Sequence, residues 1–141
     1  MPMKIIDILE IKKMEWVMQH FPQAKEIASH YYSGQYKDHE YLELPENKHL
    51  RLLPEDREIP EGHLPALTGA EAFRLLPAKL NIENTTYWKN LTELETGSLI
   101  LKYGSDFPPI IDKVGLISIG KDLVEICFDM MTRLVETQII T

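Results

Sequence analysis

The sequence predicts an α+β fold in which a small antiparallel sheet packs against a C-terminal helix. Three observations lead to this prediction: a helix start at Thr68, segments rich in β-branched and aromatic residues after it, and a strongly amphipathic closing helix. The connections between them are short, which favours antiparallel strands with helices on one face. Residues 66–141 therefore form an α-β-β-(β)-α unit, preceded by a helical part, 1–34, and a connection, 35–65.

Residues 1–34 are expected to be helical. Apolar residues between Ile5 and Phe21 cover more than one side of a helix, so this helix is either buried within its own chain or meets another chain through its second face. Pro22 suits the first turn of a second helix, and Gly34 suits its end. The inner stripe of that helix is Ala24, Ile27, Ala28 and Tyr31. A helical hairpin and one bent helix fit this pattern equally well.

Residues 35–65 have a different composition. They contain four prolines, eight acidic residues and four basic residues, which gives a net charge of −4. Prolines at this density prevent a continuous helix. Leucines occur at positions 42, 44, 50, 52 and 53, so short extended pieces of this segment can dock on the core. We interpret the segment as a long acidic connection.

The first helix of the 66–141 unit begins with a capping box. The Thr68 hydroxyl can accept from the amide of Glu71, whose carboxylate reaches back to the Thr68 amide. Ala70, Phe73 and either Leu75 or Leu76 form the apolar face. Pro77 ends or kinks the helix, because its ring cannot occupy a continuing turn.

Two strands are expected at residues 85–88 and 98–103, with residues 95–97 as the turn between them. Residues 114–119 form a third strand candidate, weakened by Gly115 and suited to an edge.

The closing helix starts near Lys121. Leu123, Cys127, Met130 and Leu134 follow the spacing of a helix stripe, and polar residues occupy the opposite side. Asp129 can pair with Arg133 one turn later. Cys127 is the single cysteine, so an internal disulfide cannot form. We expect it to be a small core residue.

Composition excludes several classes of function. The chain has 141 residues, so one domain is the default. Its charge of −7 and its lack of a basic cluster argue against nucleic acid. No apolar run approaches the ~18–20 residues of a membrane span. Without a signal peptide, a cytoplasmic location is the default. Motifs for phosphate, zinc or nucleophilic catalysis are absent, so no cofactor or metal is expected and an enzyme is not favoured.

Two sets of residues are candidates for a site. Tyrosines favour interfaces, and four crowd where the helical part meets the acidic connection; they form either a binding surface or a cover for the core edge. They are Tyr31, Tyr32, Tyr36 and Tyr41. The alternative is a small enzyme or ligand site where residues 35–65 cover the sheet. Its candidates are His39, His49, His63, Asp106 and Asp112.

A resemblance adds a context. The run 67–77 and the closing helix, 123–136, resemble short uncharacterised proteins encoded by phages and prophages, over about the last 75 residues. This resemblance implies a mobile-element origin and assigns no functional residue. We therefore expect an accessory protein that binds another protein, or a second copy through its first helix, rather than nucleic acid or a membrane.

Overall fold

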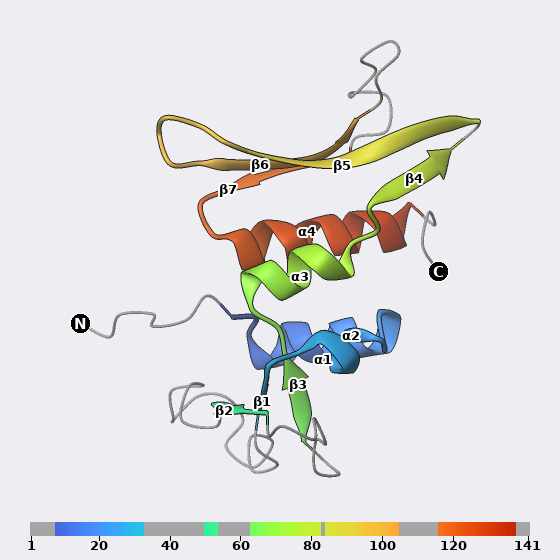
Figure 1. Ribbon diagram of the computed structural model, residues 1–141. Helices are drawn as coiled ribbons and strands as arrows, with labels where there is room; N and C mark the ends of the chain where they lie inside the picture. The colour runs from blue at the N-terminus through green and yellow to red at the C-terminus, as the bar shows by residue number, and fades with distance from the viewer. Residues whose placement is uncertain (1–7, 33–49, 54–62, 83, 105–115, 138–141) are drawn as a thin grey trace. The chain divides into compact units, whose positions relative to one another are not determined.

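The chain forms two compact units, residues 1–71 and residues 72–141, and each is described by itself. The computed structural model describes residues 8–32, 50–53, 63–82, 84–104 and 116–137 (Figure 1). The described residues contain both helices and antiparallel sheets, which confirms the predicted α+β class. The prediction of one domain with three sub-regions stays a prediction.

Helix α1 (Ile11–His20) carries the main apolar stripe of the first unit. Ile11, Met14 and Val17 recur every three positions, so they share one side of the helix, and each is at most 1% exposed. The helix contacts strand β3 (Leu64–Ala66). Of the two interpretations of this helix, burial within its own chain accounts for that stripe.

The second predicted helix is shorter than expected. α2 (Ala24–Ile27) is a single turn, and the backbone becomes extended at Ala28. His30–Tyr32 then form strand β1. The prediction that Tyr31 belongs to a helix stripe is therefore wrong, because β1 is held by strands from later in the chain, a stabilisation that a local pattern does not contain.

Strand β1 is the centre of a three-stranded antiparallel sheet with the order β2-β1-β3. β2 (Leu50–Leu52) lies within the predicted connection and confirms that extended pieces occur there. Tyr31 is opposite Arg51 on one side and Pro65 on the other. Its neighbour Tyr32 therefore points to the opposite face of the sheet.

Helix α3 (Gly69–Leu75) begins with the predicted capping box. The Thr68 amide donates to Oε1 of Glu71 (3.0 Å), and the Glu71 amide donates to Oγ1 of Thr68 (3.3 Å). The helix ends before Pro77, as its ring requires. The capping-box prediction is confirmed.

The second unit contains a four-stranded antiparallel sheet with the order β4-β5-β6-β7. Its strands are β4 (Lys79–Ile82), β5 (Thr85–Glu93), β6 (Leu99–Gly104) and β7 (Ile117–Gly120). The β5–β6 turn contains Gly97 with a φ of +89°, a conformation that glycine adopts without strain. β7 confirms the third strand at 117–119; of the predicted range, residues 114 and 115 lie outside the described residues and Leu116 precedes the strand. Strand β4 was not predicted.

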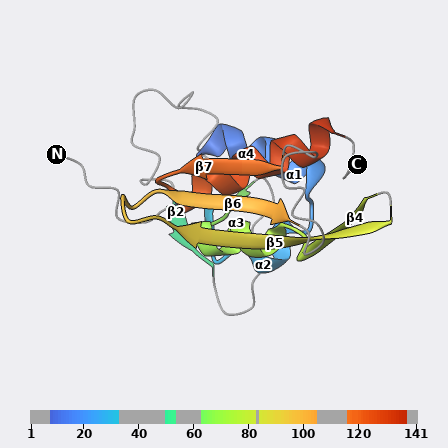
Figure 2. The same ribbon diagram turned by 90° about the horizontal axis from the view of Figure 1, so that it is seen from above.

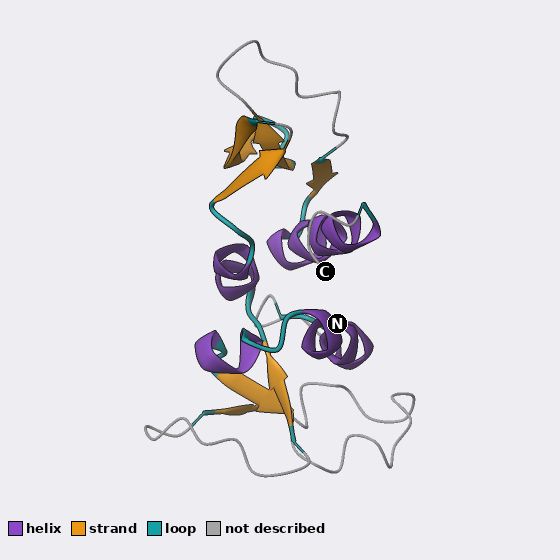
Figure 3. Ribbon diagram, turned by 90° about the vertical axis from the view of Figure 1, so that its right-hand side faces the viewer, coloured by secondary structure: helices purple, strands orange, loops and turns teal. Residues whose placement is uncertain are grey.

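Helix α4 (Leu123–Glu136) lies along one face of this sheet and contacts β6 and β7 (Figures 1 and 3). Its buried residues are Val124, Ile126, Cys127, Met130, Met131 and Leu134. The approach is close at Gly120, where an added β-carbon would lie 2.7 Å from Cγ2 of Ile126. The packing of the closing helix on a small sheet is confirmed, as is the burial of Cys127.

Candidate functional site

The predicted tyrosine surface is only partly within the described residues. Tyr36 and Tyr41 lie outside them. Tyr32 is 1% exposed, and its hydroxyl donates to the Leu9 carbonyl oxygen at 2.6 Å. This burial removes Tyr32 from the predicted binding set and makes it a core residue. Tyr31 is partly exposed on the opposite face of the sheet.

The alternative histidine–carboxylate site cannot be assembled from the described residues either. His39, His49, Asp106 and Asp112 lie outside them. His63 lies next to Tyr31, with 5.4 Å between the ring centroids, and its buried Nδ1 has no hydrogen-bond partner among the residues that the structure describes. Within the described ranges, no group of three or more His, Cys, Asp or Glu side chains is arranged to hold a metal ion.

A group of polar side chains lies beneath the sheet of the second unit. Lys89 Nζ donates to the carbonyl oxygens of Phe73 (2.7 Å) and Leu76 (3.0 Å). Burial lowers the pKa of Lys89, and the charge of Cys127 acts in the opposite direction. The Tyr103 hydroxyl donates to the Pro77 carbonyl oxygen at 2.6 Å, and burial raises its pKa. These donors satisfy backbone carbonyls at the end of α3, which is a structural role.

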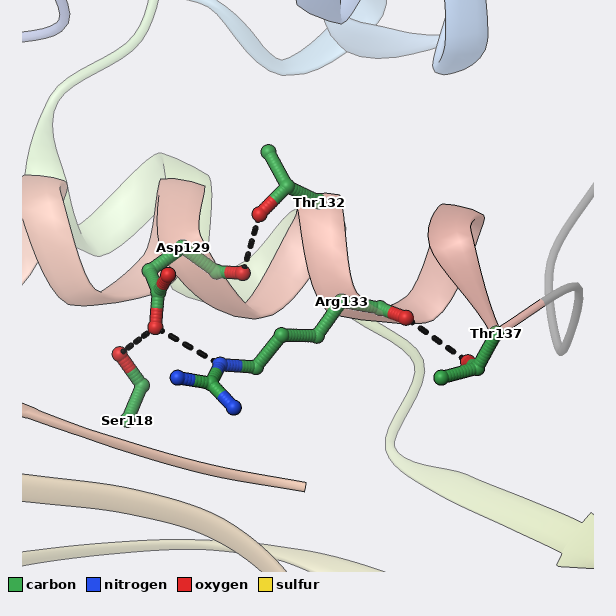
Figure 4. Close-up of polar contacts among 5 residues, drawn as sticks. All are labelled: Ser118, Asp129, Thr132, Arg133 and Thr137. Carbon is green, nitrogen blue, oxygen red and sulfur yellow. Dashed lines mark hydrogen bonds and ion pairs between the residues drawn. The ribbon is translucent and has the colours of Figure 1, made fainter. Parts of the chain in front are cut away.

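A second polar cluster joins β7 to α4 (Figure 4). The Ser118 hydroxyl donates to Oδ2 of Asp129 at 2.8 Å, and Nε of Arg133 donates to the same oxygen at 2.9 Å. The Asp129–Arg133 pair is the one predicted from their spacing. Ser118 is buried, whereas the side chains of Asp129 and Arg133 are 46% and 43% exposed.

The opposite face of the four-stranded sheet, which we call the outer face, is the larger exposed feature. The strand registers align its residues, because cross-strand partners share a face and alternate residues change face. It comprises Lys79, Asn81, Thr86, Trp88, Asn90, Thr92, Ile100, Lys102, Gly104, Ile117 and Ile119. In Figure 2 the three strands β5, β6 and β7 lie side by side in front of α4. Among the described residues of this unit, no helix covers the outer face.

Part of the outer face is apolar or aromatic, although a solvent-facing sheet is normally polar. Trp88 is 48% exposed and Ile119 is 62% exposed. Ile100 is directly opposite Ile119, and Ile117 follows on the same strand, so three isoleucines are neighbours. Exposed apolar patches of this kind mark interaction sites.

The charge of the outer face differs from that of the whole chain. Lys79 and Lys102 are its charged residues, and its described positions carry no Asp or Glu, although the net charge of the chain is −7. Nζ of Lys79 lies 5.7 Å from the centroid of the Trp88 ring, a cation–π distance. The face therefore combines an aromatic anchor with positive charge.

Sequence reasoning identified Trp88 as a strand residue and did not identify it as a site residue. The signal was present in residues 99–101, where apolar residues occupy both alternating positions instead of one. A strand with two apolar faces either is covered on both sides or presents one of them to a partner. Which of these applies depends on the position of α4.

None of the helices in the described ranges has both the length and the apolar character of a membrane span. No protein-family model, curated protein or solved structure matches this chain. The relationship to phage-type proteins stays a prediction.

Proposed function

We propose that this chain is an accessory protein of a phage or related mobile element that acts by binding another protein through the outer face of its four-stranded sheet. The proposal depends on the half-exposed Trp88, which lies on the same face of the sheet as a cluster of three isoleucines. Tryptophan is among the residues that contribute most to binding at protein interfaces. The mobile-element context comes from the resemblance of the C-terminal region.

The chemistry of the partner follows from the composition of the outer face. An apolar side chain of the partner packs against Ile100, Ile117 and Ile119. Carboxylates of the partner face Lys79 and Lys102, because opposite charges at the rim of an interface favour the correct partner and its orientation. Removing Trp88 from water on binding strengthens its contact with the Lys79 ammonium group.

Binding can be followed through Trp88 itself. In a Trp16→Phe background Trp88 is the single tryptophan, so its emission reports on the outer face. A protein captured from the source cell is identified, purified and titrated against this variant. We expect a blue shift of the emission, because the partner excludes water from the indole ring.

Variants then test whether the outer face is the binding surface. Trp88→Ala should weaken binding by about tenfold or more. Leu52→Ala is the matched control, because Leu52 is 71% exposed and belongs to the other unit. If Trp88→Ala binds with unchanged affinity, the proposal is contradicted. If Tyr31→Ala loses affinity instead, binding is assigned to the tyrosine surface. Salt-sensitive quenching by a single-stranded oligonucleotide would assign the face to nucleic acid.

A further inference from the structure

The exposed edge of β7 lacks the features that normally protect an edge strand. In the described residues β7 pairs with β6 alone, and its sequence, Ile-Ser-Ile-Gly, has no charge and no proline. Natural edge strands usually carry charges, prolines or bulges that prevent pairing with another chain. The other free edges carry charge, with Lys79 on β4 and Glu93 at the end of β5.

The hydrogen-bond pattern identifies which backbone groups of this edge are available. The Tyr103 amide donates to the Leu116 carbonyl oxygen at 3.1 Å. Hydrogen-bonding direction alternates along an antiparallel strand, so Leu116, Ser118 and Gly120 turn their backbone groups towards β6. Ile117 and Ile119 therefore direct their N–H and C=O groups away from the sheet. Both also present their side chains on the outer face.

We infer that β7 pairs antiparallel with β7 of a second copy of this chain around a two-fold axis at Ser118. In this register Ile117 of one copy is opposite Ile119 of the other, and the available amides and carbonyls of both copies form four hydrogen bonds. The two Ser118 residues form the central pair without backbone bonds between them. The four-stranded sheets join into one continuous sheet, and the isoleucine clusters of the two outer faces meet.

Charge at this edge favours a second copy as the occupant. The Ser118 hydroxyl reaches Asp129, so the half-exposed Asp129–Arg133 pair lies beside the centre of β7 (Figure 4). Each copy contributes one carboxylate and one guanidinium there. Each carboxylate keeps the guanidinium of its own chain as its partner at 2.9 Å, so the charges of the two pairs sum to zero at the two-fold axis. Two chains with a net charge of −7 each thus meet at a locally neutral surface.

This pairing differs from the dimer expected from the sequence. That expectation used the first helix, whose Ile11, Met14 and Val17 are already buried within the chain. Ile117 and Ile119 belong to both proposals, but the two are tested separately, because the dimer is measured on the chain alone and Trp88→Ala tests the binding of a different protein.

The experiment measures mass in solution by sedimentation or light scattering over a concentration series up to about 1 mM. The wild-type chain should form dimers. Ile119→Lys should weaken the dimer by about tenfold or more, because it adds a charge at the edge. Leu52→Lys, the same change at an exposed leucine of the other unit, should leave the dimer unchanged. Circular dichroism establishes that both variants are folded.

A second measurement tests the register. In a Cys127→Ala background, Ser118→Cys should form an intermolecular disulfide under mild oxidation, because facing residues without backbone bonds are about 4.5 Å apart between Cα atoms. Ile117→Cys should cross-link slowly, because its facing residue is Ile119 of the second copy. A chain that stays monomeric at every concentration overturns the inference, and so does a monomer whose β7 edge binds a different protein instead. A dimer that is unaffected by Ile119→Lys, or without the Ser118→Cys cross-link, also overturns it.

Discussion

Lys89 and Tyr103 are directly opposite each other on β5 and β6, and both donate hydrogen bonds to carbonyl oxygens where α3 ends. The last carbonyls of a helix have no partner within the helix, and a cation beside them interacts favourably with the helix dipole. Nζ of Lys89 also lies 4.0 Å from the centroid of the Phe73 ring. Two side chains of the sheet thus provide the cap for this helix.

Replacing the Lys89 cap should destabilise the fold. Lys89→Met keeps the length of the side chain and removes the donor to Phe73 and Leu76, so the free energy of unfolding should fall by about 1–2 kcal/mol. Lys102→Met is the control on the outer face and should change it by less than about 0.5 kcal/mol. Urea denaturation measures both. Equal losses in the two variants would contradict the capping role.

The raised pKa of Tyr103 predicts a loss of stability at alkaline pH. Burial raises this pKa above the ordinary 10.0, and Cys127 acts in the same direction. The folded chain therefore keeps a proton that the unfolded chain releases, so its stabilising contribution is complete below pH 10 and is lost as the pH rises further. The lowered pKa of Lys89 has the opposite effect on stability. The unfolded chain holds this proton more tightly than the folded chain does, so this group favours the folded state more as the pH rises.

Comparison of the wild-type chain with Tyr103→Phe isolates this effect, since Lys89 is present in both. Between about pH 9 and about pH 11 the wild-type chain should lose more stability than the variant does. At neutral pH the variant should be less stable by about 1 kcal/mol, because the Pro77 carbonyl loses its donor. Parallel pH profiles for the two proteins would contradict the assignment.

Gly120 should not tolerate a larger side chain. A β-carbon there would lie 2.7 Å from Cγ2 of Ile126, so α4 or β7 must shift in Gly120→Ala. We expect a loss of about 1–3 kcal/mol in unfolding free energy. In an Ile126→Ala background the same change should cost less, because the opposing methyl group is absent. A double-mutant cycle measures this coupling, and additive losses would show that the contact is unimportant.

Tyr32 and Tyr31 should respond differently to the loss of the hydroxyl. Tyr32→Phe leaves the buried Leu9 carbonyl oxygen without its donor at 2.6 Å, so we expect a loss of about 1–3 kcal/mol. Tyr31→Phe is the matched control on the more exposed face and should change stability by less than about 0.5 kcal/mol. Thermal or urea unfolding measures both. A large effect of Tyr31→Phe with none of Tyr32→Phe would reverse the assignment of faces.

Features held by nearby residues could be predicted from the sequence. The Thr68–Glu71 capping box, the turn at Gly97 and the Asp129–Arg133 pair each depend on partners within four positions. The apolar stripe of α4 is also local, because helix periodicity alone brings its residues to one side. These predictions are confirmed.

Features held by distant residues could not be predicted in the same way. β1 lies where a helix stripe was expected, because β2 and β3 provide its hydrogen bonds from later in the chain. β4 forms because it pairs with β5 through a turn at Asn84, which has a φ of +68°. A short strand has little stability without its neighbours, so its own residues do not identify it reliably.

The sequence by itself determined the α+β class, the helix start at Thr68 and the apolar side of the closing helix. Only the tertiary structure decided which apolar side chains remain exposed. Trp88 and Ile119 face solvent because α4 covers the other face of their sheet, whereas Tyr32 is buried within the first unit. Residue type sets the free energy that burial can contribute, but the positions of the surrounding elements determine which residues are buried.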